Sequence, residues 1–122
     1  TFVIFITDGD DTCNYDNSFD NSGNGWRRAA YQAQSLYNAG AADPTQKVST
    51  FVIVFGGSAN VSSANQIAYG GSGMTAVPAS GSAWTRAATP AEIAACTACR
   101  SAFTATTAAD LDVSDGVDRE LP

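Results

Sequence analysis

The sequence predicts an α/β domain built on an open, mostly parallel sheet. Two runs are apolar almost throughout, at residues 2–7 (FVIFIT) and 48–55 (VSTFVIVF). Because neither run alternates apolar with polar residues, both are typical of parallel strands that are buried on two faces. Between them, apolar residues recur at helical spacing over residues 26–39, which predicts an amphipathic helix. A strand, a helix and a second strand in this order form a βαβ unit with a right-handed crossover.

The rest of the chain is predicted to add short elements. Residues 63–66 (SANQ) have the form of a capping box and predict a short helix through Tyr69. Residues 89–92 (TPAE) combine an N-cap, a proline and a glutamate three positions on, which predicts another helix start. A short last strand is expected at residues 102–105, and a final helix is expected to begin near Thr107. The sheet would then hold three or four strands.

Length and composition limit the classes of protein that fit. A chain of 122 residues with 44% hydrophobic residues is one globular domain or a fragment of one. The chain begins inside an apolar run that needs neighbouring strands, so we expect the sheet to be incomplete at its N-terminus. The net charge of −6 argues against a nucleic-acid partner. The sequence holds no run of 18 apolar residues, which argues against membrane insertion.

The three cysteines are Cys13, Cys96 and Cys99. The C-x-x-C pair follows the predicted helix, whereas a thioredoxin-like redox pair opens a helix after a strand. Zinc needs four ligands, and the sequence contains no histidine to complete a set. These observations favour a disulfide between Cys96 and Cys99 over a metal-bound or free pair, without excluding either alternative. Cys13 is then left without a partner in the chain.

An acidic cluster follows the first apolar run. Asp8, Asp10 and Asp11 come directly after residues 2–7, and ligands of open α/β sheets bind at the carboxyl ends of the strands. Because the sequence contains no histidine, a metal here would need oxygen ligands. Such ligands suit Mg²⁺, Mn²⁺ or Ca²⁺. The cluster therefore predicts a hard-cation site or a phosphoryl-transfer site.

The string FVIFITDGDDTC resembles the third metal-site motif of von Willebrand factor A domains. The order that follows agrees with it: a helix containing AAYQAQSLYNAG, the strand VSTFVIVFGG, the segment ANQIAYGGSG and the ending AFTATTAADL. The pattern is most similar to the A domains of PilC/PilY-type adhesins at the tips of type IV pili. The resemblance implies a Rossmann-like sheet, of which residues 1–122 form the carboxyl-terminal half. Residues 74–100 would be an insertion before the last strand.

The resemblance also implies a metal ion-dependent adhesion site. The family takes ligands from a D-x-S-x-S loop, from a threonine and from the aspartate of T-D-G. That aspartate corresponds to Asp8, with Thr7 and Asp10 as candidate ligands beside it. No D-x-S-x-S occurs in the chain, so it is expected upstream of Thr1, and this chain alone is expected to bind a cation weakly or not at all.

The function implied is non-enzymatic adhesion or protein binding by an exported, extracellular protein of the cell surface. Such a protein would pass through the periplasm and associate with a pilus. Its partners would be a protein or host-surface ligand, other pilus subunits, or the remaining part of its own domain. In the intact domain, a carboxylate of the partner would complete the coordination of the cation.

A second hypothesis is enzymatic. Residues 8–12 (DGDDT) also resemble the D-x-D-x-T motif of haloacid-dehalogenase-type phosphohydrolases. Asp8 would be the nucleophile and Asp10 the general acid, with Mg²⁺ bound between them and the phosphate. That family also needs a hydroxyl residue ending the second strand and a later lysine. Here Phe55 is followed by two glycines, and Lys47 precedes the second strand, so this hypothesis ranks second.

Overall fold

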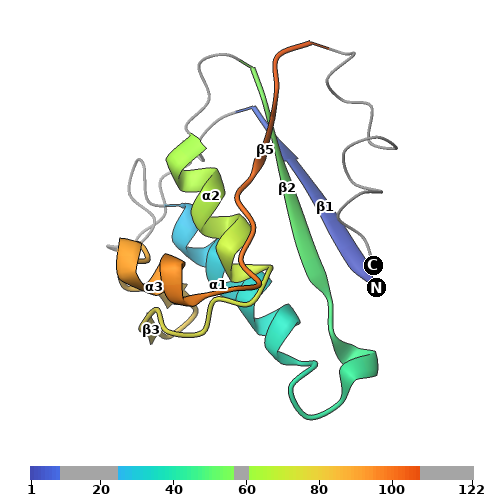
Figure 1. The fold of residues 1–122 in the computed structure, drawn as a ribbon, viewed down its shortest axis with the longest axis vertical. Coiled ribbons are helices and arrows are strands. Elements are labelled where there is room, and N and C mark those ends of the chain that lie inside the picture. Colours follow the sequence, from blue (N-terminus) through green and yellow to red (C-terminus); the bar gives the residue numbers. More distant parts are fainter. Residues whose placement is uncertain (9–24, 57–60, 108–122) are drawn as a thin grey trace.

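A computed structural model of the protein describes residues 1–8, 25–56 and 61–107 (Figure 1). The described elements are β1 (Phe2–Thr7), α1 (Trp26–Asn38), the 3₁₀ turn η1 (Pro44–Gln46), β2 (Ser49–Phe55), α2 (Val61–Gly70), β3 (Ala79–Ser80), β4 (Ala83–Trp84), α3 (Pro90–Ala95) and β5 (Phe103–Ala105).

The fold class is α/β, as predicted, with a parallel sheet of three strands in the order β1-β2-β5. Strands β3 and β4 form a separate antiparallel pair. The predicted helix, the two long strands and the short last strand are all present, with bounds that differ by about one residue from those expected. The predicted final helix after Thr107 lies outside the described residues.

The core lies between the sheet and the helices α1 and α2, which Figure 1 shows on the same side of the sheet. Val52 and Val54 of β2 point into this layer and pack with Ala30, Ala64 and Ala68, among others. Small side chains on the helices let them approach β2 closely, and this burial supplies the main stabilisation of the fold.

Glycine is required at position 71, where the chain that follows α2 passes close to Thr50 of β2. A β-carbon on Gly71 would lie 2.4 Å from the β-carbon of Thr50, which is far inside van der Waals contact. The close approach also allows the backbone N–H of Thr50 to donate to the carbonyl of Gly71 at 3.0 Å. The glycine run that follows the helix is therefore a packing feature as well as a helix end.

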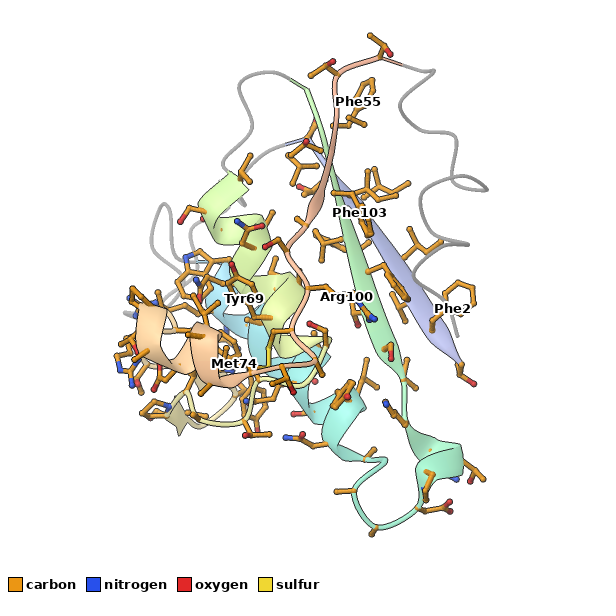
Figure 2. All side chains as sticks on the ribbon, viewed as in Figure 1. Phe2, Phe55, Tyr69, Met74, Arg100 and Phe103 are labelled. Carbon is orange, nitrogen blue, oxygen red and sulfur yellow. A yellow bond between two sulfur atoms is a disulfide. The ribbon has the colours of Figure 1, made fainter. Side chains whose placement is uncertain are left out.

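Residues 74–100 leave the sheet and return to it at β5. They contain the small pair β3 and β4 and the helix α3. Trp84 is fully buried, and its indole N–H donates to Gln34 Oε1 of α1 at 3.2 Å. The amide of Gln34 donates to the carbonyl of Met74 at 2.5 Å. Figure 2 shows Met74 and Tyr69 inside this helical layer, away from the sheet.

The first apolar run forms a strand, but within residues 1–8, 25–56 and 61–107 that strand is not buried on two faces. Strand β1 pairs only with β2 there, at the edge of the sheet. Phe2, Val3, Phe5 and Ile6 are all exposed, Ile6 by 56%. The apolar run correctly predicted a strand, but local sequence carries no information about which neighbours cover it.

The short helix predicted through Tyr69 is present as α2, but the capping box predicted at residues 63–66 is wrong. Helix α2 already begins at Val61, so Ser63 lies inside it. Gln66 instead uses its side-chain oxygen to accept the backbone N–H of Ala88 at 2.8 Å. The second predicted capping box is confirmed: Thr89 accepts from the backbone of Glu92, and Glu92 accepts from that of Thr89.

Candidate functional site

The carboxyl ends of the three parallel strands lie level with one another. Thr7 of β1 is paired with Val54 of β2, and Val54 is paired with Thr104 of β5. The backbone N–H of Gly56 donates to the carbonyl of Ala105 at 2.9 Å. The residues that follow the strands therefore share one edge, which is where open α/β sheets bind their ligands.

Asp8 occupies this edge, as the sequence predicts. It is exposed and directly follows β1. Its neighbour Thr7 is the last residue of the strand and is half-buried. Asp10, the third predicted ligand, lies outside the described residues. The structure therefore brings Thr7 and Asp8 to the predicted edge.

Within residues 1–8, 25–56 and 61–107, no three histidine, cysteine or acidic side chains gather into a metal-binding group. The acidic residues of these segments are Asp8, Asp43 and Glu92. Asp43 caps η1, which precedes β2 and so lies at the other edge of the sheet. The carboxylate oxygens of Asp8 suit Mg²⁺, Mn²⁺ or Ca²⁺. A cation held only by the described residues at this edge would take most of its ligands from water.

The other two carboxylates are engaged elsewhere. The side chain and backbone of Thr45 donate to Asp43 at 2.7 and 3.0 Å and lower the pKa of its carboxyl. Arg86 donates to both oxygens of Glu92, at 2.9 and 2.8 Å. Mainly through this contact, and then through the backbone N–H of Thr89, the pKa of Glu92 is lowered to about 2. Glu92 thus stabilises the start of α3.

Among the described residues, the hydroxyl and the lysine that a phosphohydrolase would need do not lie near Asp8. Strand β2 ends at Phe55, followed by Gly56, so its carboxyl end offers no hydroxyl. Lys47 precedes β2 and lies at the opposite edge, where its Nζ is 4.5 Å from the centre of the Tyr37 ring. A seven-residue strand spans roughly 20 Å, so Lys47 is far from Asp8.

Cys96 and Cys99 are joined at disulfide distance just after α3, with their α-carbons 5.4 Å apart. Both are half-buried against the core cluster. The predicted pairing is therefore compatible with the fold. Cys13 lies outside the described residues.

No helix among the described residues is both long and apolar enough to cross a membrane. This agrees with the absence of a long apolar run in the sequence.

A pocket at the amino-terminal edge of the sheet was not predicted. Lys47 and Arg100 both line it, and they come shortly before β2 and β5. Parallel strands begin at the same edge, so basic residues placed just before two of them were the signal that could have identified this pocket.

The comparisons with known proteins add no further assignment. No protein-family model, curated protein or solved structure matches this chain. What can be said of its function rests on its own residues and their arrangement.

Proposed function

We propose that this protein is a non-enzymatic adhesion or protein-binding module of von Willebrand A type, from an exported protein associated with a pilus. The observation that carries the proposal is the position of Asp8. It is exposed at the carboxyl end of β1, level with the carboxyl ends of the two other parallel strands, β2 and β5. That is the ligand-binding edge of an open α/β sheet.

The chemistry of this edge favours a hard divalent cation. Asp8 would supply a carboxylate oxygen, Thr7 a hydroxyl and Asp10 a second carboxylate. The cation would supply an open coordination position for an acidic group of the partner. Because the described residues supply so few oxygen ligands at this edge, we expect the chain alone to bind a cation weakly.

The exposure of β1 supports a polypeptide partner. Among the described strands β1 lies at the edge of the sheet, and Phe2 and Ile6 are 47% and 56% exposed. An apolar edge strand of this kind is a template for another chain. Candidate partners are a host-surface ligand, other pilus subunits or the remaining part of the same domain. The paired cysteines suit an oxidising, extracellular location.

The test is a titration of the ¹⁵N-labelled protein with Mn²⁺, whose unpaired electrons broaden nearby amide signals. We expect broadening centred on Thr7 and Asp8 at millimolar metal, lost in Asp8→Asn. Asp43→Asn is the matched control, because it removes an exposed carboxylate from the other edge while asparagine still caps η1. Broadening that persists in Asp8→Asn, or that centres on Asp43, would contradict the proposal.

An activity assay on the same protein distinguishes the adhesion hypothesis from the phosphohydrolase hypothesis. We expect no turnover of an aryl phosphate with Mg²⁺, because the lysine and hydroxyl such enzymes need do not lie near Asp8 among the described residues. Turnover that is abolished by Asp8→Asn would refute the adhesion proposal and support the enzyme.

A further inference from the structure

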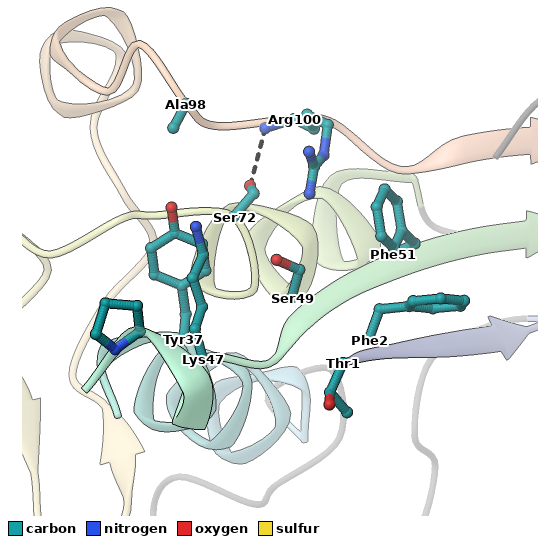
Figure 3. Close-up of a pocket in the computed structure, with 10 residues that line it drawn as sticks. Thr1, Phe2, Tyr37, Lys47, Ser49, Phe51, Ser72, Ala98 and Arg100 are labelled. Carbon is teal, nitrogen blue, oxygen red and sulfur yellow. Dashed lines mark hydrogen bonds between the residues drawn. The ribbon is translucent and has the colours of Figure 1, made fainter. Parts of the chain in front are cut away.

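The pocket at the amino-terminal edge of the sheet has a volume of about 630 Å³. This lies within the range of small-molecule and peptide-side-chain sites. Phe2 begins β1, Ser49 begins β2 and Arg100 comes shortly before β5, so the pocket lies where the three strands start. Tyr37 and Lys47 close the side next to α1 (Figure 3). It lies at the opposite edge of the sheet from Asp8.

The pocket is positively charged although the chain as a whole carries −6. Its described lining includes Lys47 and Arg100 and no aspartate or glutamate. Within the described part of the chain, neither cation lies at ion-pair distance from a carboxylate. Asp43, the acidic residue next to this edge, accepts hydrogen bonds from Thr45 instead. Two cations therefore share a pocket without a counter-charge among the described residues.

Arg100 is held in place by its backbone and by an aromatic ring. Its backbone N–H donates to Ser72 Oγ at 2.9 Å, and that hydroxyl donates to the carbonyl of Ala68 at 2.6 Å. Its guanidinium lies 4.3 Å from the centre of the Phe51 ring. Nε is buried without a hydrogen-bond acceptor. The guanidinium is thus fixed by stacking, and its terminal nitrogens are not engaged by a described carboxylate.

Lys47 faces the same space from the other side. Figure 3 shows its side chain along the Tyr37 ring, with Ser49 between it and Arg100. The ammonium is 4.5 Å from the centre of the Tyr37 ring. A cation over an aromatic face is attracted by the ring and remains able to donate to an anion. The hydroxyl of Ser49 adds a neutral donor on the floor of the pocket.

We propose that this pocket binds a peptide carboxylate carried next to an aromatic or apolar side chain. The fork of a guanidinium matches the two oxygens of a planar carboxylate, and the ammonium adds a second charge. The rings of Phe2 and Phe51 would receive the apolar group beside it. This proposal does not depend on the metal site at Asp8.

The experiment is an NMR titration of the ¹⁵N-labelled, 122-residue chain with three probes. N-acetyl-phenylalanine carries a chain-end carboxylate, acetyl-Phe-Glu-amide carries a side-chain carboxylate, and N-acetyl-phenylalaninamide carries neither. We expect one or both carboxylates to bind with a Kd of roughly 1 mM or tighter. Their shifts should map to the pocket, and the neutral amide should bind at least about tenfold more weakly. Whichever carboxylate binds identifies the source.

Variants test the two cations separately. Arg100→Gln and Lys47→Gln should each weaken the carboxylate probe about tenfold or more, because each removes a charge-assisted hydrogen bond. Arg28→Gln is the control, since it removes an exposed positive charge on α1 outside the pocket lining. If Arg100→Gln loses its dispersed spectrum through loss of packing on Phe51, Lys47→Gln still decides the question.

Three results would overturn the proposal. These are a neutral amide that binds as tightly as the carboxylates, shifts that lie outside the pocket, and an Arg28→Gln variant that weakens binding as much as Lys47→Gln.

Discussion

Ile6 and Ile53 form a matched pair that tests how β1 is placed. They are partners in adjacent parallel strands, so both side chains lie on the same face of the sheet. Ile53 of β2 is 5% exposed, whereas Ile6 of β1 is 56% exposed. The two residues share identity, strand type and face, and they differ mainly in what covers them.

Replacing each isoleucine by alanine should therefore give very different losses of stability. Ile53→Ala should lower the free energy of unfolding by about 2–5 kcal/mol, because it removes buried methyl groups and leaves a cavity. Full burial of an isoleucine side chain is worth about 1.5–3 kcal/mol in transfer free energy. Ile6 realises less than half of its possible burial, so Ile6→Ala should lower it by about 1 kcal/mol or less.

The assay is urea unfolding followed by circular dichroism at several protein concentrations. The midpoint should shift strongly for Ile53→Ala and slightly for Ile6→Ala, with the slope unchanged in both. Equal losses in dilute protein would refute the placement of β1 at an open edge. A loss for Ile6→Ala that grows with protein concentration would show that a second copy covers this strand, since association stabilises by mass action.

Three further outcomes are expected. Gln34→Leu should lower the free energy of unfolding by about 2–6 kcal/mol in urea titrations, because a buried indole N–H and a buried carbonyl each lose a partner worth about 1–3 kcal/mol. Thiol titration of denatured, unreduced protein should find Cys96 and Cys99 blocked, and three free thiols would contradict this. Reduction of the disulfide should destabilise the fold by at most about 2 kcal/mol, because the loop that it closes is so short. Since Arg86 and then the backbone of Thr89 lower the pKa of Glu92 from 4.5 to about 2, its stabilising effect should be complete above pH 4.5 and lost as the pH falls toward 2. When urea midpoints are measured across this pH range, the part of their pH dependence that comes from Glu92 should be absent in Glu92→Gln.

Much of the fold was predictable because it is encoded over short distances. The helical spacing of residues 26–39 predicted α1, and the threonine, proline and glutamate of residues 89–92 predicted the start of α3. The capping pattern at residues 63–66 failed because α2 already begins at Val61, so Ser63 lies inside the helix. Gln66 accepts a hydrogen bond from the backbone of Ala88, 22 positions away, and a local sequence pattern cannot predict such a contact.

The candidate sites divide in the same way. Asp8 was located from sequence because it directly follows an apolar strand, and the fold class alone puts strand ends at a ligand-binding edge. The pocket of Lys47 and Arg100 was not located, because these residues are far apart in the chain. Only the pairing of β2 with β5 makes the segments before them neighbours.

By itself, the sequence determined which segments form strands and helices, that the sheet is parallel, and where Asp8 lies along its strand. These properties depend on side-chain pattern, capping and chain connectivity, all of which act between near neighbours. Only the tertiary structure decided that Trp84 is buried against α1 and that two cations share one pocket. Burial and local charge are sums over whatever surrounds a residue, and those surroundings come from segments that are distant in sequence.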